Sequence, residues 1–588
     1  MCGIFGYIGK KETAAEMILE GLRTLEYRGY DSWGIAVKIA DRIAVEKKVG
    51  KIGNAKVTLS KSSIGIGHTR WATHGGVTTA NAHPHLDCTE KIALLHNGII
   101  ENYALIKEEL IAKGHRFISE TDTEVAVHLI EENLKTSDDF PEAVRMAFRR
   151  FTGLNAIVVM SSEKDQVVAA KNGSPLVVGR NGDAFFLASD TAGIVLHTKE
   201  IHFMKDNEMV VLGDDISLLN VSDGAPLVPE FETIDWAIEE ADQGDFPHFM
   251  IKEIVEQPKV IRNIAETYSD QIDDLAQVIK NAKGTFFIGA GTAYHASLAG
   301  VYLFSKIAKE HVNTSMASEF NYLEDFLTKQ SLIIALSQSG ETIDIVEPLT
   351  RAKLQKGSQI VAIVNALGST IYRMADKKLL LGAGPEKAVA STKAYSAKLS
   401  VLLLLSYSMI EKTSSAQQQL LEAATEIDRL TSDAQLQNIE RLAEMLHMKQ
   451  HMFTVGRGVS YATALEAALK IKEVSYIHTE GLAGGELKHG TIALIEKGTP
   501  CIVFAPQDET YEAILSNAME IKARGGLIIG ISPKKAEVFD HWIEVKETGD
   551  AAILTQIVPA QLLAYYLAVK KGFDPDKPRN LAKSVTVK

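Results

Sequence analysis

The first residues of the chain place a cysteine directly after the initiator methionine, in Met1-Cys2-Gly3. Because cysteine is small, removal of Met1 is expected to leave Cys2 with a free α-amine beside its thiol. An α-amine titrates at about pH 8 and a thiol at about pH 8.5, so near neutrality the amine can take the thiol proton. One residue would then supply a nucleophile and its general base. The alternative is an ordinary small residue before a strand.

Three further stretches near the N-terminus carry polar residues suited to an amide substrate. Arg70, beside Trp71, offers a guanidinium for bidentate capture of a carboxylate. Asn97-Gly98 offers an amide and a backbone N–H that can form an oxyanion hole. Asp122 is a candidate for binding an ammonium group. The alternatives are a surface Arg-Trp stack, an Asn-Gly turn, and a helix N-cap at 121–124.

A different polar loop, Leu336-Ser337-Gln338-Ser339-Gly340-Glu341-Thr342, lies between an apolar strand pattern and a helix pattern. Its hydroxyls and the N–H groups of the first helical turn suit a phosphate without a metal ion. The alternative is a plain Ser/Thr helix cap.

Acid–base side chains follow later in the chain. Glu466, Lys470 and Glu473 have helical spacing i, i+4, i+7 and therefore lie on one face. A solvated ladder of salt bridges is the alternative explanation. A glycine-rich loop after this helix ends on His489, and Lys583 lies in a C-terminal tail whose composition predicts that it folds over another part of the protein.

Composition narrows the class of protein. The chain has 588 residues, enough for about three or four domains, with 46% hydrophobic and 23% charged residues, typical of a globular protein. A net charge of -13 argues against nucleic acid or an anionic membrane as the main partner. Cys2, Cys88 and Cys501 are too far apart to indicate a disulfide framework or a metal site. With no signal-peptide pattern and no apolar run long enough to span a bilayer, a cytoplasmic protein is expected.

The N-terminal part is expected to form an α+β sandwich that positions the first set of polar residues. Short apolar runs bounded by glycine, asparagine or charge predict strands at 4–8, 34–37, 64–68, 92–95 and 156–160. Helical spacing covers 14–25 and 122–134. The next segment reads as a linker that enters a helix near Pro258.

The remainder contains an internal duplication. Four pairs of segments recur at a nearly constant spacing: 287–294 and 453–461, 341–342 and 509–510, Gly357 and Gly525, 392–399 and 555–562. This regularity indicates two copies of one domain, each with alternating strands and helices around a parallel sheet. The loop 505–510 of the second copy lacks the serines and has gained acid, so phosphate is expected in the first copy only. Both copies lack the third glycine of the dinucleotide fingerprint, which argues against an NAD site.

The N-terminal motifs resemble the class II glutamine amidotransferase domain. The motifs, in matching order, are 2–6, 25–32, 68–75, 96–98 and 119–124. The resemblance implies an N-terminal-nucleophile fold, an αββα sandwich, in which Cys2 attacks glutamine while Asn97 and Gly98 hold the oxyanion. It also implies a glutamine-binding set: Arg70 on the carboxylate, Asp122 on the α-ammonium, with Trp71, Thr73 and His74. Trp33 departs from the family, which usually has a small residue there.

The duplicated part resembles paired sugar isomerase (SIS) domains with a flavodoxin-like α/β fold. The whole chain resembles the glutamine–fructose-6-phosphate aminotransferase family, most specifically at 485–490 and 581–587. The resemblance implies a sugar-phosphate-binding set: Thr292, Ser337, Gln338, Ser339, Thr342, Val389, Ser391 and Lys470. It implies that Glu473 moves a proton between C1 and C2, that His489 reaches in from a second subunit to open the ring, and that Lys583 forms a Schiff base. Ala293 and Thr491 replace a usual serine and proline.

The family resemblance implies a homodimeric enzyme making D-glucosamine 6-phosphate and L-glutamate from D-fructose 6-phosphate and L-glutamine, the first step of the hexosamine pathway. Ammonia would pass through a channel between the sites, with no metal and no organic cofactor. The expected domains are 2–215 glutaminase, 216–275 linker, 276–420 and 440–575 SIS domains, and 576–588 a tail over the sugar site. Two alternative functions remain: a deglycase-like enzyme that acts on another amino-sugar phosphate, and a sugar-phosphate sensor with a vestigial glutaminase.

Overall fold

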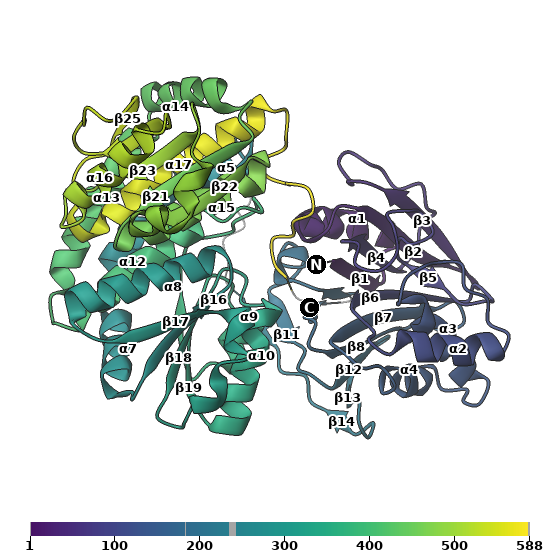
Figure 1. The fold of residues 1–588 in the computed structure, drawn as a ribbon. Coiled ribbons are helices and arrows are strands. Elements are labelled where there is room, and N and C mark those ends of the chain that lie inside the picture. Colours follow the sequence, from purple (N-terminus) through teal and green to yellow (C-terminus); the bar gives the residue numbers. More distant parts are fainter. Residues whose placement is uncertain (1, 183, 235–242, 586–588) are drawn as a thin grey trace. The chain divides into compact units, whose positions relative to one another are not determined.

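The computed structural model describes residues 2–182, 184–234 and 243–585 (Figure 1). The chain divides into two compact units, Met1–Glu239 together with Ala582–Lys588, and Glu240–Leu581. The expectations that concern Met1, part of the linker (235–242) and the last residues of the tail (586–588) fall outside the described residues.

Two antiparallel sheets form the first unit. The first sheet has the spatial order β15 (Glu232–Thr233), β11 (Glu200–Phe203), β9 (Val177–Asn181), β10 (Ala184–Ala188), β1 (Gly3–Gly9), β4 (Ile64–Arg70), β2 (Ser32–Ile39), β3 (Arg42–Val49). The second has the order β14 (Pro226–Leu227), β13 (Ile216–Asn220), β12 (Glu208–Leu212), β8 (Val167–Asn172), β7 (Asn155–Ser161), β6 (Ile92–Gly98), β5 (His85–Leu86). The five strands predicted from the sequence are confirmed in β1, β2, β4, β6 and β7.

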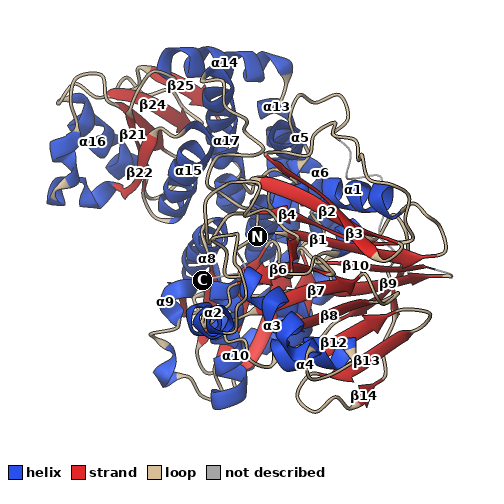
Figure 2. Cartoon of the chain, turned by 90° about the vertical axis from the view of Figure 1, so that its right-hand side faces the viewer, coloured by secondary structure: helices blue, strands red, loops and turns tan. Residues whose placement is uncertain are grey.

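Alternate side chains along β1 point to opposite faces of the first sheet, which shows how this unit is layered. Ile4 and Ile8 join the core between the two sheets, whereas Phe5 and Tyr7 pack with α1 (Ala14–Leu25) on the outer face of the first sheet. The outer face of the second sheet packs against α2 (Tyr103–Ala112), α3 (Glu124–Leu134) and α4 (Phe140–Phe148) (Figure 2). The predicted αββα sandwich is therefore confirmed.

The sandwich extends further along the chain than the expected boundary at residue 215. Strands β13, β14 and β15 lie in the segment expected to be a linker, yet all three belong to the two sheets. Their lengths are five, two and two residues, too short for a periodic pattern to identify them from sequence. The second unit begins with α5 (Phe249–Val255) and α6 (Gln257–Thr267), with Pro258 in the first turn of α6.

The second unit contains the same set of elements twice. The first copy comprises α7 (Ser269–Asn281), β16 (Thr285–Gly289), α8 (Thr292–Leu303), β17 (Val312–Met316), β18 (Leu332–Ser337), α10 (Ile343–Arg351), β19 (Gln359–Val364), β20 (Lys377–Leu380) and α12 (Lys393–Ser408). The second comprises α14 (Asp433–Leu446), β21 (His451–Gly456), α15 (Val459–Ser475), β22 (His478–Ala483), β23 (Pro500–Phe504), α16 (Tyr511–Lys522), β24 (Leu527–Ser532), β25 (His541–Glu544) and α17 (Ala552–Lys570).

Both sheets of the second unit are parallel and have the same strand order. The orders are β17-β16-β18-β19-β20 and β22-β21-β23-β24-β25. Numbered within each copy, this is the flavodoxin-like order 2-1-3-4-5. The predicted duplication and the parallel α/β fold of each copy are confirmed.

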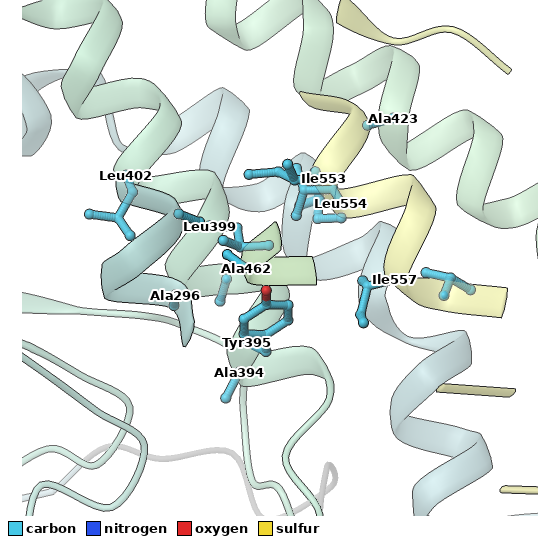
Figure 3. Packing of buried hydrophobic residues seen from close by; sticks show 14 of the residues in the cluster. Ala296, Ala394, Tyr395, Leu399, Leu402, Ala423, Ala462, Ile553, Leu554 and Ile557 are labelled. Atoms are coloured by element: carbon cyan, nitrogen blue, oxygen red, sulfur yellow. The ribbon is translucent and has the colours of Figure 1, made fainter. Parts of the chain in front are cut away.

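Helices from both copies meet in one hydrophobic core. Figure 3 shows Tyr395 of α12 near Ala296 of α8, Ala462 of α15 and Ile557 of α17. The helix Gly549–Lys570, which includes α17, is long and apolar enough to cross a membrane, but 89% of its apolar window is buried inside the protein. Its composition is accounted for by this core position.

Candidate functional site

Cys2 lies directly before β1, where two backbone contacts define its surroundings. The Trp71 N–H donates to Cys2 Sγ at 3.2 Å, and the thiol donates to the Trp71 carbonyl at 3.6 Å. Burial raises the pKa of the Cys2 thiol, while the Trp71 N–H and the nearby charge of Arg70 act in the opposite direction. A nucleophilic thiolate at this position therefore needs a local base to remove its proton.

The side chain of Asn97, at the end of β6, is oriented by a histidine behind it. Asn97 Nδ2 donates to the Cys2 carbonyl at 3.0 Å, and Asn97 Oδ1 lies 3.0 Å from His68 Nε2. His68 Nε2 also lies 3.1 Å from the His96 carbonyl, so this nitrogen carries the proton and donates to both oxygens. Burial lowers the pKa of His68 to about 3. A neutral His68 therefore holds the Asn97 amide with its N–H₂ group toward Cys2.

Gly98 must be a glycine in this arrangement. Its φ is +130°, and a Cβ there would lie 2.1 Å from the Leu154 carbonyl oxygen. The Asn-Gly pair ends a strand paired with β7, so the alternative of a simple turn is wrong.

A single pocket contains all the predicted residues of the first unit. It is lined by Cys2, Arg70, Trp71, Thr73, His74, His83, His96, Asn97, Gly98, Thr121, Asp122 and Thr123. The Arg70 side chain is buried and donates to the carbonyls of His74, Gly75 and Gly76, so the surface stack considered for it is wrong. Asp122 accepts the Ile100 N–H at 2.8 Å.

Two local expectations concern residues near this pocket. The helix N-cap considered at 121–124 is Thr123, directly before α3, although no side chain makes a capping hydrogen bond. Trp33 lies opposite Thr69 in the sheet and is buried in the core on the α1 side, where Lys48 lies 5.2 Å above its ring. His68, missed as a functional candidate although it opens the motif at 68–75, is the residue that positions Asn97.

In the second unit, the first copy brings its polar loop to the point where the strand order changes direction. Strand β16 lies between β17 and β18, so the loops after β16 and β18 flank the crevice where ligands bind in this fold. Ser337 ends β18, its Oγ accepts the Gly340 N–H at 2.9 Å, and Ser339 Oγ accepts the Glu341 N–H at 3.2 Å. Gly340 has φ +65°, and a Cβ there would collide with Ser369.

Glu466, Lys470 and Glu473 form a buried network rather than a solvated ladder. Lys470 Nζ lies 3.4 Å from Glu466 and 2.7 Å from Glu473, and Glu466 and Lys470 are fully buried. Burial lowers the pKa of Lys470, but the two carboxylates raise it overall. Burial raises the pKa of Glu466, but Lys470 and His295 lower it overall. Glu466 and Lys470 are therefore held in their charged forms.

This network crosses between the two copies. Thr292, the first residue of α8, donates to Glu466 of α15 at 3.0 Å and accepts from Lys470 at 3.0 Å. His295 Nδ1 lies 2.8 Å from the second oxygen of Glu466. Glu466 and His295 were not among the sequence candidates for substrate binding; the i, i+4 spacing from Lys470 was the only signal for Glu466.

The remaining sugar-site candidates are distributed over three segments. Ser391 donates to Glu386 at 2.9 Å just before α12, and the Val389 N–H donates to the Asp576 carbonyl at 3.0 Å. His489 is exposed at the end of the 3-10 turn Gly484–His489. Lys583 lies in the terminal residues that group with the first unit.

The equivalent loop of the second copy, residues 505–510, is acidic, and its aspartate forms hydrogen bonds within the loop itself. Asp508 Oδ1 accepts both the Thr510 N–H at 2.8 Å and the Thr510 hydroxyl at 2.6 Å. A carboxylate in this position repels an anion, whereas the hydroxyl-lined loop of the first copy does not.

Comparisons with known proteins agree with both units. A glutamine amidotransferase domain model matches residues 68–195, and a SIS domain model matches 278–407 and 445–571. A protein of Pyrococcus horikoshii named glutamine--fructose-6-phosphate aminotransferase [isomerizing] is 44% identical, with all of both chains covered. One of the same name from Thermococcus kodakarensis is 43% identical at the same coverage.

Solved structures resemble the second unit. The C-terminal domain of glucosamine-fructose-6-phosphate aminotransferase from Francisella tularensis has a TM-score of 0.52 and 31% identity, covering 57% of this chain and 99% of that one. Tagatose-6-phosphate ketose/aldose isomerase from Escherichia coli has a TM-score of 0.50 and 16% identity, covering 56% of this chain and 96% of that one, and shares the fold.

Proposed function

Because this chain belongs to the glutamine–fructose-6-phosphate aminotransferase family, we propose that its first unit releases ammonia from L-glutamine and its second unit adds that ammonia to D-fructose 6-phosphate. The products are L-glutamate and D-glucosamine 6-phosphate. The observation that carries this proposal is the pocket in which Cys2 faces the oriented amide of Asn97, in one chain with a hydroxyl-lined phosphate loop.

Product identification tests the reaction. With amide-¹⁵N glutamine and fructose 6-phosphate, mass spectrometry should find the label in glucosamine 6-phosphate. Ammonia release without any labelled amino sugar would favour the sensor hypothesis. Amination of a different sugar phosphate in a substrate panel would favour the deglycase-like rival.

The first unit carries out acyl transfer. The Cys2 sulfur attacks the side-chain carbonyl carbon of glutamine, and the α-amine freed by removal of Met1 takes the thiol proton. The Asn97 Nδ2 and Gly98 N–H groups stabilise the resulting oxyanion. The tetrahedral intermediate expels ammonia, which receives the proton, and water then hydrolyses the thioester to glutamate. Arg70 and Asp122 bind the α-carboxylate and α-ammonium of glutamine.

The second unit isomerises and aminates the sugar. The phosphate binds to the loop 337–342 and the N-terminus of α10, while Thr292, Val389, Ser391 and Lys470 contact the sugar. His489 of a second subunit opens the ring, and Lys583 forms a Schiff base with the open ketone, losing water. Ammonia then attacks C2 of this Schiff base and the Lys583 amine leaves, so that C2 carries the imine of ammonia. Glu473 removes the C1 proton and returns it to C2. The exposed position of His489 supports a homodimer, and the reaction as proposed needs no metal or organic cofactor.

Removing the hydroxyls of the phosphate loop is expected to weaken fructose 6-phosphate binding. In Ser337→Ala with Ser339→Ala, each lost hydrogen bond to the phosphate costs roughly 1.5–3 kcal/mol, or at least about tenfold in Kd per hydroxyl. Isothermal titration calorimetry with fructose 6-phosphate measures this. The matched control is Asp508→Asn in the second copy, which should change the Kd little. Equal effects at both loops would contradict phosphate binding in the first copy alone.

Ammonia is proposed to travel from Cys2 to the sugar through a buried channel, because in bulk water it would be protonated and lost. Trp71 follows Arg70 and contacts Cys2 through its backbone, which a side-chain substitution leaves in place. Trp71→Ala should therefore keep glutamine hydrolysis but lower the glucosamine 6-phosphate formed per glutamate released. An assay that quantifies both products decides the matter, since an unchanged ratio rules out a gating role.

A cytoplasmic location is also proposed for this enzyme.

A further inference from the structure

Four side chains with metal-binding atoms meet in the first unit, and none of them lines the pocket that contains Cys2. Cys88 follows β5, His115 follows α2, and His128 and Glu131 lie one turn apart on α3. One ligand atom from each lies within 4.8 Å of all the others. His115 and His128 are buried. Cys88 is separated from the others by 27 to 43 positions in sequence, so no motif could indicate this cluster.

The distances between the ligand atoms lie within about 0.2 Å of the edges of a tetrahedral site. Cys88 Sγ lies 3.7 Å from His115 Nδ1 and 3.5 Å from His128 Nδ1. Glu131 Oε2 lies 3.1 Å from His115 Nδ1 and 3.2 Å from His128 Nδ1. For metal–nitrogen and metal–oxygen bonds of about 2.0–2.1 Å and a metal–sulfur bond of about 2.3 Å, tetrahedral edges are roughly 3.3–3.6 Å.

The outer nitrogen of one histidine pairs with a further carboxylate. His115 Nε2 lies 3.1 Å from Glu132 Oε2, within hydrogen-bond distance, whereas His128 Nε2 lies 3.6 Å from Glu124 Oε1, an ion-pair distance without a hydrogen bond. A carboxylate at Nε2 of His115 favours a proton there and leaves the Nδ1 lone pair directed toward the centre of the cluster. Such a carboxylate–histidine pair is typical of metal-ligating histidines.

We propose that Cys88, His115, His128 and Glu131 bind a zinc ion. A thiolate, a carboxylate and two neutral imidazoles neutralise a divalent cation, and binding releases the thiol proton to solvent. Four protein ligands leave no open position, so the site is structural. It joins three segments and holds the middle of α3, the helix that directly follows the residues 121–123 in the glutamine pocket. Without a metal, the cluster would be a set of hydrogen bonds around Glu131.

Metal content of the full-length protein tests the site. After chelator treatment and dialysis against zinc chloride, inductively coupled plasma mass spectrometry should find one zinc per chain. Cobalt(II) substitution should give a sulfur-to-cobalt charge-transfer band. The band should disappear in Cys88→Ser, whose zinc Kd should rise by more than about 100-fold, since changes to outer partners alone cost about 10–100-fold. Cys2→Ala and Cys501→Ser are the matched controls and should keep both the band and the zinc.

Glu132→Gln keeps all four ligands and tests the site if Cys88→Ser fails to fold. Its zinc Kd should rise about 10–100-fold, because the carboxylate that orients His115 is lost. Zinc should raise the Tm of the apo wild type and leave that of Cys88→Ser unchanged. No zinc retained by the wild type, or equal zinc affinity in the wild type, Cys88→Ser and Glu132→Gln, overturns the proposal.

Discussion

Replacing Cys2 with alanine is expected to abolish glutamine hydrolysis while amination of fructose 6-phosphate by added ammonia continues. Loss of a covalent nucleophile in comparable hydrolases costs on the order of 10⁶-fold in kcat. Cys2 contacts Trp71 through its sulfur and Asn97 through its backbone carbonyl, and the second contact survives the substitution. The pocket therefore keeps its shape while its chemistry is lost. Glutamate release and glucosamine 6-phosphate formation from ammonium chloride are the two measurements.

Cys501→Ser is the matched control for the loss of a thiol, because Cys501 lies in β23 of the second unit. It should retain both activities. Glutamine hydrolysis by Cys2→Ala at a rate near that of the wild type would refute the assignment of the nucleophile. A variant that retains Met1 should be equally inactive, since the α-amine is then displaced from the thiol.

In the second unit, Glu473→Gln is expected to stop sugar isomerisation and leave glutamine hydrolysis intact. A positioned general base contributes about 10²–10⁴-fold to rate, and the amide of glutamine cannot accept the C1 proton. Lys470 keeps Glu466 and Thr292 as partners, so its buried charge stays compensated and the fold should persist. Exchange of the C1 proton of fructose 6-phosphate with deuterium oxide, followed by NMR, measures the step directly.

The exposed Glu512 on α16 provides a matched control of the same chemistry. Glu512→Gln should exchange the C1 proton at the wild-type rate. If Glu473→Gln does the same, Glu473 is not the base, and Glu466 becomes the next carboxylate to test in the same network.

Much of the fold follows from patterns confined to short stretches of sequence. Helix α1 covers Ala14–Leu25, the same residues as its helical spacing, because seven of its residues are buried on one face. The sequence also predicted strands β18 and β19, because buried strands are continuous apolar runs. It predicted the recurrence of the whole set of elements from the nearly constant spacing of the repeated segments. The first-unit pocket candidates could also be identified from the sequence, because they lie at or next to the ends of strands or helices that local patterns identify.

Other features depend on contacts that no local pattern encodes. The spacing of Glu466, Lys470 and Glu473 fits a solvated face as well as a buried one. Only the packing of α15 against α8 decides between them. Strands β13–β15 gain their structure from neighbours in the sheets, and the cluster at Cys88 forms where three separate segments converge.

The chain by itself therefore determined its elements, their repetition and the residues able to do chemistry. The tertiary structure decided which of those residues share an environment. The physical reason is that periodicity and turn chemistry act over a few residues, whereas burial and charge pairing depend on groups far apart in sequence. Thr292 and Glu466, 174 positions apart, meet at 3.0 Å because two copies of one domain pack together through equivalent helices.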